Sequence, residues 1–190
     1  MSAARGRAAL FLDRDGTIME DEHYGREPAR VRLIDGAREG IRQANVCGVP
    51  VIVVTNQSGI GRGMISQAEY EAVAARLDAL LAHGQATIDA TFYCPHYPER
   101  DGPCRCRKPG TLLYEQAAEQ FGLDLEASVY VGDRARDVAA AVRFGGTGLL
   151  VPSHGTPAEE RDTAGVRLIP TIREAMTVAL ATLGCAGHGA

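Results

Sequence analysis

Two aspartates, Asp13 and Asp15, stand directly after the apolar run of residues 8–12. The run predicts a short buried strand, and alternate residues of extended backbone point to the same side, so both carboxylates can share one pocket. Gly16 lets the chain turn sharply after them. Such a pair suits nucleophilic catalysis, in which one carboxylate attacks and the other handles the proton. An Asp-rich turn is the alternative for an isolated motif, but the polar segments downstream favour the catalytic interpretation.

A second polar segment follows a second predicted strand. Residues 50–54 form a continuous, mostly β-branched apolar run, which is typical of a strand buried on both faces. Thr55, Asn56, Gln57 and Ser58 come next, at the start of a glycine-rich loop. Their hydroxyls, amides and backbone N–H groups could hold phosphate oxygens. An ordinary turn with helix-capping side chains is the alternative.

Positive charge gathers at Arg105, Arg107 and Lys108, although the formal net charge of the 190-residue chain is -4. A phosphate that approaches two carboxylates needs cations to offset the repulsion. The basic segment therefore indicates a small anionic ligand, with a solvated basic loop as the alternative. The negative net charge and the lack of tryptophan argue against a nucleic-acid partner.

Asp133 follows a third predicted strand, residues 128–131. We expect it to join Asp13 around a hard cation, because Mg²⁺ takes a few carboxylates together with substrate oxygens and water. Capping of the next helix is a second use for the same side chain. Asp137 lies one turn further along that helix and is expected to stand outside the direct metal ligands.

One histidine and three cysteines form a separate group. Cys94, His96, Cys104 and Cys106 match the closed tetrahedral ligand set of structural zinc. The single-residue gap inside each pair is shorter than usual, and chance clustering of free thiols is the alternative. Because four protein ligands leave no open position, the zinc would be structural. It would hold the irregular loop 94–110 and, with it, the basic residues after the last cysteine.

Apolar runs alternate with helical segments along the chain. The strands are predicted near residues 8–12, 50–54, 91–93, 128–131, 148–151 and 166–169, and the helices near 36–46, 66–82, 111–121, 134–144 and from 171. This alternation predicts an α/β fold with a doubly wound, mostly parallel, Rossmann-like sheet covered by helices on both faces. Residues 1–190 are expected to form a single domain with a frayed tail from about Gly184.

The remaining cysteines fall outside these groups. An odd number of cysteines, five, without a secretion signal argues against a disulfide framework. Cys47, near a helix end, is expected to be an inert core thiol, and Cys185 to be incidental in the tail. Since no apolar run is long enough to cross a bilayer, a cytoplasmic location is the default expectation.

Taken in this order, the motifs resemble those of the haloacid dehalogenase superfamily of phosphatases. The resemblance covers residues 8 to about 151 and rests on segments 11–18, 55–63, 94–96, 104–109 and 132–133. Within the superfamily, the sequence is most similar to phosphatases that remove the 7-phosphate of D-glycero-D-manno-heptose 1,7-bisphosphate, in heptose nucleotide precursor biosynthesis. Histidinol-phosphate phosphatases share the zinc loop and the aspartate pair and stay open as an alternative, as do phosphatases of other small sugar phosphates. A zinc-stabilised binding module is the non-enzyme alternative.

The resemblance implies a role for each motif. Asp13 would be the nucleophile that takes the phosphoryl group as an aspartyl-phosphate, and Asp15 would protonate the leaving sugar oxygen and then activate water. Catalytic Mg²⁺ would bind Asp13, the main-chain carbonyl of Asp15, and Asp133. Thr55 and Lys108 would stabilise the phosphoryl group, and structural Zn²⁺ would bind the group of one histidine and three cysteines.

The resemblance also implies how substrate is recognised. The family has no large cap domain, and the zinc loop partly covers the site instead. The residues implied near the substrate are Asp21, Glu22, His23, Tyr24, Asn56, Gln57, Ser58, Arg107 and Arg134. This sequence departs from the family in having Arg at position 134, where Lys is common, and a shorter stretch between His96 and Cys104. These departures bear on the identity of the substrate more than on the mechanism. The expected partner is a small phosphorylated sugar, and binding to nucleic acid or to a membrane is not expected. The protein is expected to be a monomer.

Overall fold

The computed structural model describes residues 6–185 and contains a six-stranded parallel sheet. The strands are β1 (Leu10–Leu12), β2 (Val51–Asn56), β3 (Ala90–Cys94), β4 (Val129–Gly132), β5 (Thr147–Leu150) and β6 (Val166–Leu168). Their order is β3-β2-β1-β4-β5-β6, and each neighbouring pair is parallel. Leu12 of β1 pairs with both Val53 and Val131, so the carboxyl ends of β1, β2 and β4 meet at one edge of the sheet.

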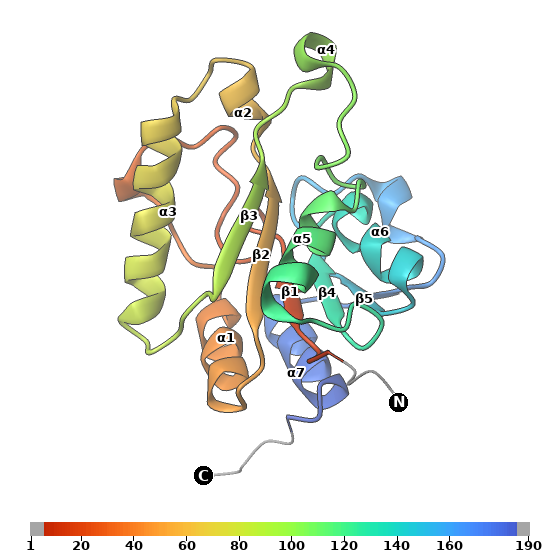
Figure 1. Cartoon of the computed structure of the whole chain (residues 1–190). Coiled ribbons are helices and arrows are strands. Elements are labelled where there is room, and N and C mark those ends of the chain that lie inside the picture. Colours follow the sequence, from red (N-terminus) through yellow and green to blue (C-terminus); the bar gives the residue numbers. More distant parts are fainter. Residues whose placement is uncertain (1–5, 186–190) are drawn as a thin grey trace.

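Helices cover both faces of this sheet (Figure 1). They are α1 (Ala37–Val46), α2 (Ser58–Gly61), α3 (Gln67–Ala82), α4 (Pro98–Asp101), α5 (Leu112–Phe121), α6 (Ala135–Phe144) and α7 (Ile172–Thr182), with 3₁₀ turns η1 (Pro28–Arg30) and η2 (Ala158–Arg161). α1, α3 and α7 share a core with Leu10 and Leu12, whereas α5 and α6 share the opposite core with Phe11. Alternate residues of β1 thus enter different cores, which explains its uninterrupted apolar run. The predicted doubly wound α/β fold is confirmed.

Local signals set where several elements begin and end. Helix α3 starts with a capping box, in which Ser66 Oγ accepts a hydrogen bond from Glu69 N while the Glu69 carboxylate accepts one from Ser66 N. Helix α5 ends at Gly122 in the left-handed conformation, φ 64°. The glycine-rich loop predicted after the second strand contains the short helix α2, and the irregular loop predicted over residues 94–110 contains the short helix α4. A single turn of helix is too short to show a periodic pattern, so the sequence does not reveal it.

The prediction for the two remaining cysteines is wrong, because Cys47 and Cys185 form a disulfide. Helix α1 packs against α7, and this brings the residues beyond their ends to a Cα–Cα distance of 5.8 Å across a sequence separation of 138. Cys185 is buried and its N–H donates to Leu180 O at 2.8 Å, so the predicted frayed tail does not begin at Gly184. Residues 186–190 of that tail lie outside the described residues.

Across residues 6–185, no helix combines the length and the apolar character that a membrane span requires.

Candidate active site

A cavity of about 340 Å³ opens where β1, β2 and β4 end. Asp13, Thr55 and Asp133, one from each of these strand ends, line it together. Most of the other predicted site residues line it as well: Asp15, Asp21, His23, Tyr24, Asn56, Gln57, Ser58, Arg107 and Arg134. Two of the predicted catalytic and substrate residues do not. Glu22 is paired with Arg30 at 2.7 Å, and Lys108 is buried behind Asp13.

Lys108 is held by three oxygen atoms. Its Nζ donates to Asp13 Oδ1 at 2.5 Å, to Val54 O at 2.6 Å and to Asp137 Oδ1 at 2.8 Å. Burial alone would lower the pKa of Lys108, but the two carboxylates outweigh it and raise the pKa, so the ammonium group stays charged. Asn56 holds the backbone of Lys108, because its Oδ1 accepts from Lys108 N at 3.0 Å and its Nδ2 donates to Lys108 O at 3.2 Å. The cation is therefore fixed by both its side chain and its backbone.

Asp13, Asp133 and Asp137 bring carboxylate oxygens within 4.8 Å of one another. Burial raises the pKa of Asp13, although Lys108 opposes the effect, and burial also raises the pKa of Asp133 to about 6. A hard cation would relieve this repulsion between buried carboxylates, and the all-oxygen donor set fits Mg²⁺. Gly16 leaves room for the group: its φ is 79°, and a Cβ there would lie 2.6 Å from Asp133 Oδ2.

The hydrogen bonds of the Asp15 carboxylate come from outside the acidic group of Asp13, Asp133 and Asp137. It accepts hydrogen bonds from Arg14 Nε at 3.1 Å, from Arg14 Nη2 at 3.0 Å and from Gln57 Nε2 at 2.7 Å. The same Gln57 nitrogen donates to Thr55 Oγ1 at 3.0 Å. This arrangement is compatible with the two roles that the resemblance implies for Asp15, proton transfer by the carboxylate and cation binding by the main-chain carbonyl.

Residues 21–24, the predicted substrate loop, line the cavity through Asp21, His23 and Tyr24. His23 and Tyr24 have left-handed φ angles of 46° and 66°, and Asp21 Oδ1 accepts from His23 N at 2.9 Å. The Arg62 guanidinium lies 6.0 Å from the centroid of the Tyr24 ring and 3.6 Å from that of Tyr97. Arg62 therefore connects the substrate loop with the loop that carries the predicted zinc ligands.

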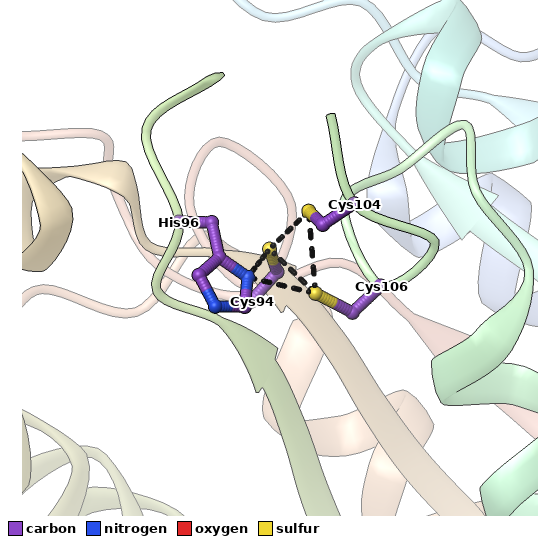
Figure 2. A group of neighbouring side chains, drawn as sticks. All are labelled: Cys94, His96, Cys104 and Cys106. Atoms are coloured by element: carbon purple, nitrogen blue, oxygen red, sulfur yellow. Dashed lines mark hydrogen bonds between the residues drawn. The ribbon is translucent and has the colours of Figure 1, made fainter. Parts of the chain in front are cut away.

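The predicted zinc ligands converge (Figure 2). Cys106 Sγ lies 3.1 Å from Cys94 Sγ, 3.4 Å from Cys104 Sγ and 3.1 Å from His96 Nδ1. Ligand atoms around a tetrahedral zinc with bonds of about 2.3 Å would lie roughly 3.8 Å apart, so a small outward shift would fit the ion. Burial raises the pKa of the Cys94 thiol and so disfavours its thiolate form. A bound metal ion would favour the thiolate, because a coordinating cysteine is deprotonated. The donor set therefore fits zinc, and Arg107 follows it directly in the chain.

Sequence reasoning did not place every residue of the cavity wall in the site. The wall also contains Arg14, Gly25, Gly59, Arg62, Arg136, Asp137 and Gly155. Asp137 was expected outside the direct metal ligands, yet its carboxylate belongs to the acidic group. Arg14 stands between the two aspartates, a position that could have signalled it. Arg136 carries no such signal, because nothing in its spacing separates it from a surface arginine.

Known proteins match this chain in sequence and fold. Residues 105–175 match the family model described as "HAD-hyrolase-like", where HAD denotes haloacid dehalogenase. The chain is 38% identical over 154 residues to the D-glycero-beta-D-manno-heptose-1,7-bisphosphate 7-phosphatase of Escherichia coli strain K12, covering 78% of this chain and 81% of that protein. It is 36% identical over 167 residues to the Salmonella typhi protein of the same name, covering 85% and 89%.

A solved structure extends the match to almost the whole fold. The crystal structure of D,D-heptose 1,7-bisphosphate phosphatase from B. bronchiseptica, complexed with magnesium and phosphate, has a TM-score of 0.82 and 30% identity, covering 92% of this chain and 98% of that one. The resemblance based on the motifs is therefore confirmed. The chain belongs to the haloacid dehalogenase superfamily, in the family of D-glycero-beta-D-manno-heptose-1,7-bisphosphate 7-phosphatases.

Proposed function

We propose that this protein removes the 7-phosphate of D-glycero-beta-D-manno-heptose 1,7-bisphosphate through an aspartyl-phosphate on Asp13. The observation that carries the proposal is the setting of the Asp13 carboxylate, which lines the cavity with the Lys108 ammonium behind it and two further carboxylates beside it. The names of the relatives support the choice of substrate and of the β anomer.

The reaction proceeds in two displacements. An oxygen of Asp13 attacks phosphorus, the bond between phosphorus and the sugar oxygen breaks, and Asp15 gives that oxygen a proton. Water then attacks the aspartyl-phosphate, Asp15 takes its proton, and phosphate leaves as Asp13 is restored. Lys108 offsets the negative charge of the phosphoryl group from a fixed position, which costs no reorganisation during the reaction. Thr55, Asn56, Gln57 and Ser58 line the same cavity as Asp13 and would form the wall beside that group.

Two metals accompany this proposal. Asp13, Asp133 and the main-chain carbonyl of Asp15 would hold Mg²⁺, which would neutralise charge on the transferring phosphoryl group. The magnesium and phosphate in the B. bronchiseptica structure support this choice of ion. The group of Cys94, His96, Cys104 and Cys106 would hold a structural Zn²⁺ and keep Arg107 and Lys108 in place.

The test is phosphate release in the presence of Mg²⁺. We expect faster turnover of the β anomer of the heptose 1,7-bisphosphate than of the α anomer, and little release from histidinol phosphate. Asp13→Asn should abolish turnover, whereas Asp35→Asn, which removes an exposed carboxylate paired with Arg173, should not change it. A preference for histidinol phosphate would overturn the substrate but keep the mechanism. Turnover by Asp13→Asn at the wild-type rate would overturn the mechanism.

A further inference from the structure

We infer that Ser153 and Thr156 are positioning residues of the cation site, because their hydroxyl groups hold Asp133 in the orientation that binds Mg²⁺. This inference rests on the magnesium site of the proposed function and extends it to residues outside the acidic group. Both hydroxyls belong to the segment 153–160, which follows β5 and includes η2.

The Ser153 hydroxyl holds the side chain of Asp133. Its Oγ donates to Asp133 Oδ2 at 2.5 Å and accepts from Gly155 N at 3.1 Å. Because the Gly155 amide occupies the acceptor side of the hydroxyl, the proton is directed at the carboxylate. A hydroxyl bound to a charged carboxylate makes one of the stronger hydrogen bonds in proteins, so this contact restricts the rotation of the carboxylate.

The Thr156 hydroxyl holds the backbone of the same aspartate. Its Oγ1 donates to Asp133 O at 2.6 Å and accepts from Ser153 N at 2.8 Å. Thr156 and Asp133 are both buried, so water competes little for these bonds. Two hydroxyls of one turn therefore fix the side chain and the backbone of Asp133, and each hydroxyl serves as both donor and acceptor.

The same segment also holds the two residues that follow Asp133. Glu160 accepts from Arg134 Nη2 at 2.5 Å and from Ala135 N at 2.7 Å. The segment 153–160 thus contacts three consecutive residues at the amino end of α6. A metal ligand held by such outer contacts loses less freedom when the ion binds, which raises the affinity for the ion.

The experiment measures metal affinity at equilibrium, separately from activity. Mn²⁺ suits the same oxygen ligands as Mg²⁺, and electron paramagnetic resonance of free Mn²⁺ counts the unbound ions. Competition with Mg²⁺ then gives the dissociation constant of Mg²⁺. We expect Ser153→Ala to raise both dissociation constants by about 10- to 100-fold, the usual cost of losing an outer contact to a metal ligand.

Two variants serve as controls for this measurement. Ser153→Thr keeps the hydroxyl, and its dissociation constants should stay within about threefold of the wild-type values. Thr163→Val removes a hydroxyl that donates to Glu160 O at 2.7 Å, close to the segment but without contact to Asp133. We expect the same small change for this variant.

Phosphate release separates a positioning role from a structural one. For Ser153→Ala, the Mg²⁺ concentration that gives half-maximal activity should rise with the dissociation constant, while kcat at saturating Mg²⁺ stays near the wild-type value. A lower kcat at every Mg²⁺ concentration, with an unchanged dissociation constant, would show a structural role and overturn the inference. Equal losses of affinity in Ser153→Ala and Ser153→Thr would also overturn it, because the hydroxyl would then not be the cause.

The wild-type titration distinguishes failure of the inference from failure of the proposed site. If the wild-type protein binds both ions and Ser153→Ala binds them equally well, the inference fails and the magnesium site stands. If the wild-type protein binds neither ion, the magnesium site of the proposed function fails and the inference fails with it.

Discussion

Lys108 is the only lysine of the chain, so its charge can be removed and observed without interference from another lysine. Its side chain is 1% exposed, and its Nζ contacts Asp13, Asp137 and the carbonyl of Val54. Lys108→Met keeps much of the side-chain volume and removes the charge. The two carboxylates then lose their shared partner in a buried setting.

We expect Lys108→Met to lower the free energy of unfolding of the magnesium-free protein by about 3–5 kcal/mol at pH 8, the cost of leaving a buried charge without its partner. The loss should be larger still at pH 9. Burial raises the pKa of Asp13 to about 8 even with Lys108 present, and removal of Lys108 raises that pKa further. Well below pH 8 the carboxyl is protonated in both folded proteins, so the difference between their stabilities grows as the pH rises above 8. With Mg²⁺ present, kcat should fall by about 10²- to 10³-fold.

Urea unfolding at the two pH values measures the change in the free energy of unfolding. The buffer contains no chelator, so that zinc is not removed from the loop 94–110. Arg105→Met is the matched control, because it removes an exposed cation of the same loop, and we expect a change within about 0.5 kcal/mol. Nitrogen-15 labelling of lysine gives a single ammonium resonance. Since the folded pKa of Lys108 is raised, that resonance should stay in its protonated form beyond the ordinary lysine value of about 10.4. The stability due to this charge is present below that value and disappears only as the pH rises through the folded pKa.

Two results would refute this reasoning. One is a Lys108→Met variant as stable as the wild type at pH 8. The other is an ammonium group that titrates at or below the ordinary lysine pKa, because the carboxylates would then not govern its charge.

Three further predictions concern other parts of the fold. A Cys104→Ala, Cys106→Ala variant shown by elemental analysis to lack zinc should lose at least about tenfold in kcat/KM, because the basic residues after the second cysteine are displaced; full activity would contradict the link. Replacing Cys47 and Cys185 with serine should lower the free energy of unfolding by about 2–5 kcal/mol, since the disulfide closes a sequence separation of 138. Urea midpoints that do not differ between oxidised and reduced wild type would exclude this tether. Gly16→Ala should raise the Mg²⁺ concentration needed for half-maximal activity, because the added Cβ presses on a carboxylate of the acidic group; an unchanged Mg²⁺ titration would contradict it.

Local patterns in the sequence were sufficient to predict the fold class and the strand ends at which the candidate site lies. Asp13, Thr55 and Asp133 each mark the end of a buried strand, and parallel strands place their carboxyl ends along one edge, so local patterns were enough to predict that these residues meet. The cysteine and histidine group was recognised from residue type and short spacing alone, and the structure brings its donor atoms together. The resemblance to a known family added roles that composition and periodicity do not carry.

The pairing of the charged groups and of the thiols depends on how the elements pack in three dimensions. The Lys108 ammonium group pairs with the carboxylate of Asp13, which lies 95 positions earlier in the chain. Arg134 pairs with Glu160, 26 positions later, and Cys47 forms a disulfide with Cys185 across 138 positions. Each pair joins elements that become neighbours only after the sheet and its helices have packed. Periodicity reports which face of an element is buried, but the choice of partner depends on the angles and distances between packed elements, so no local pattern in the sequence encodes it.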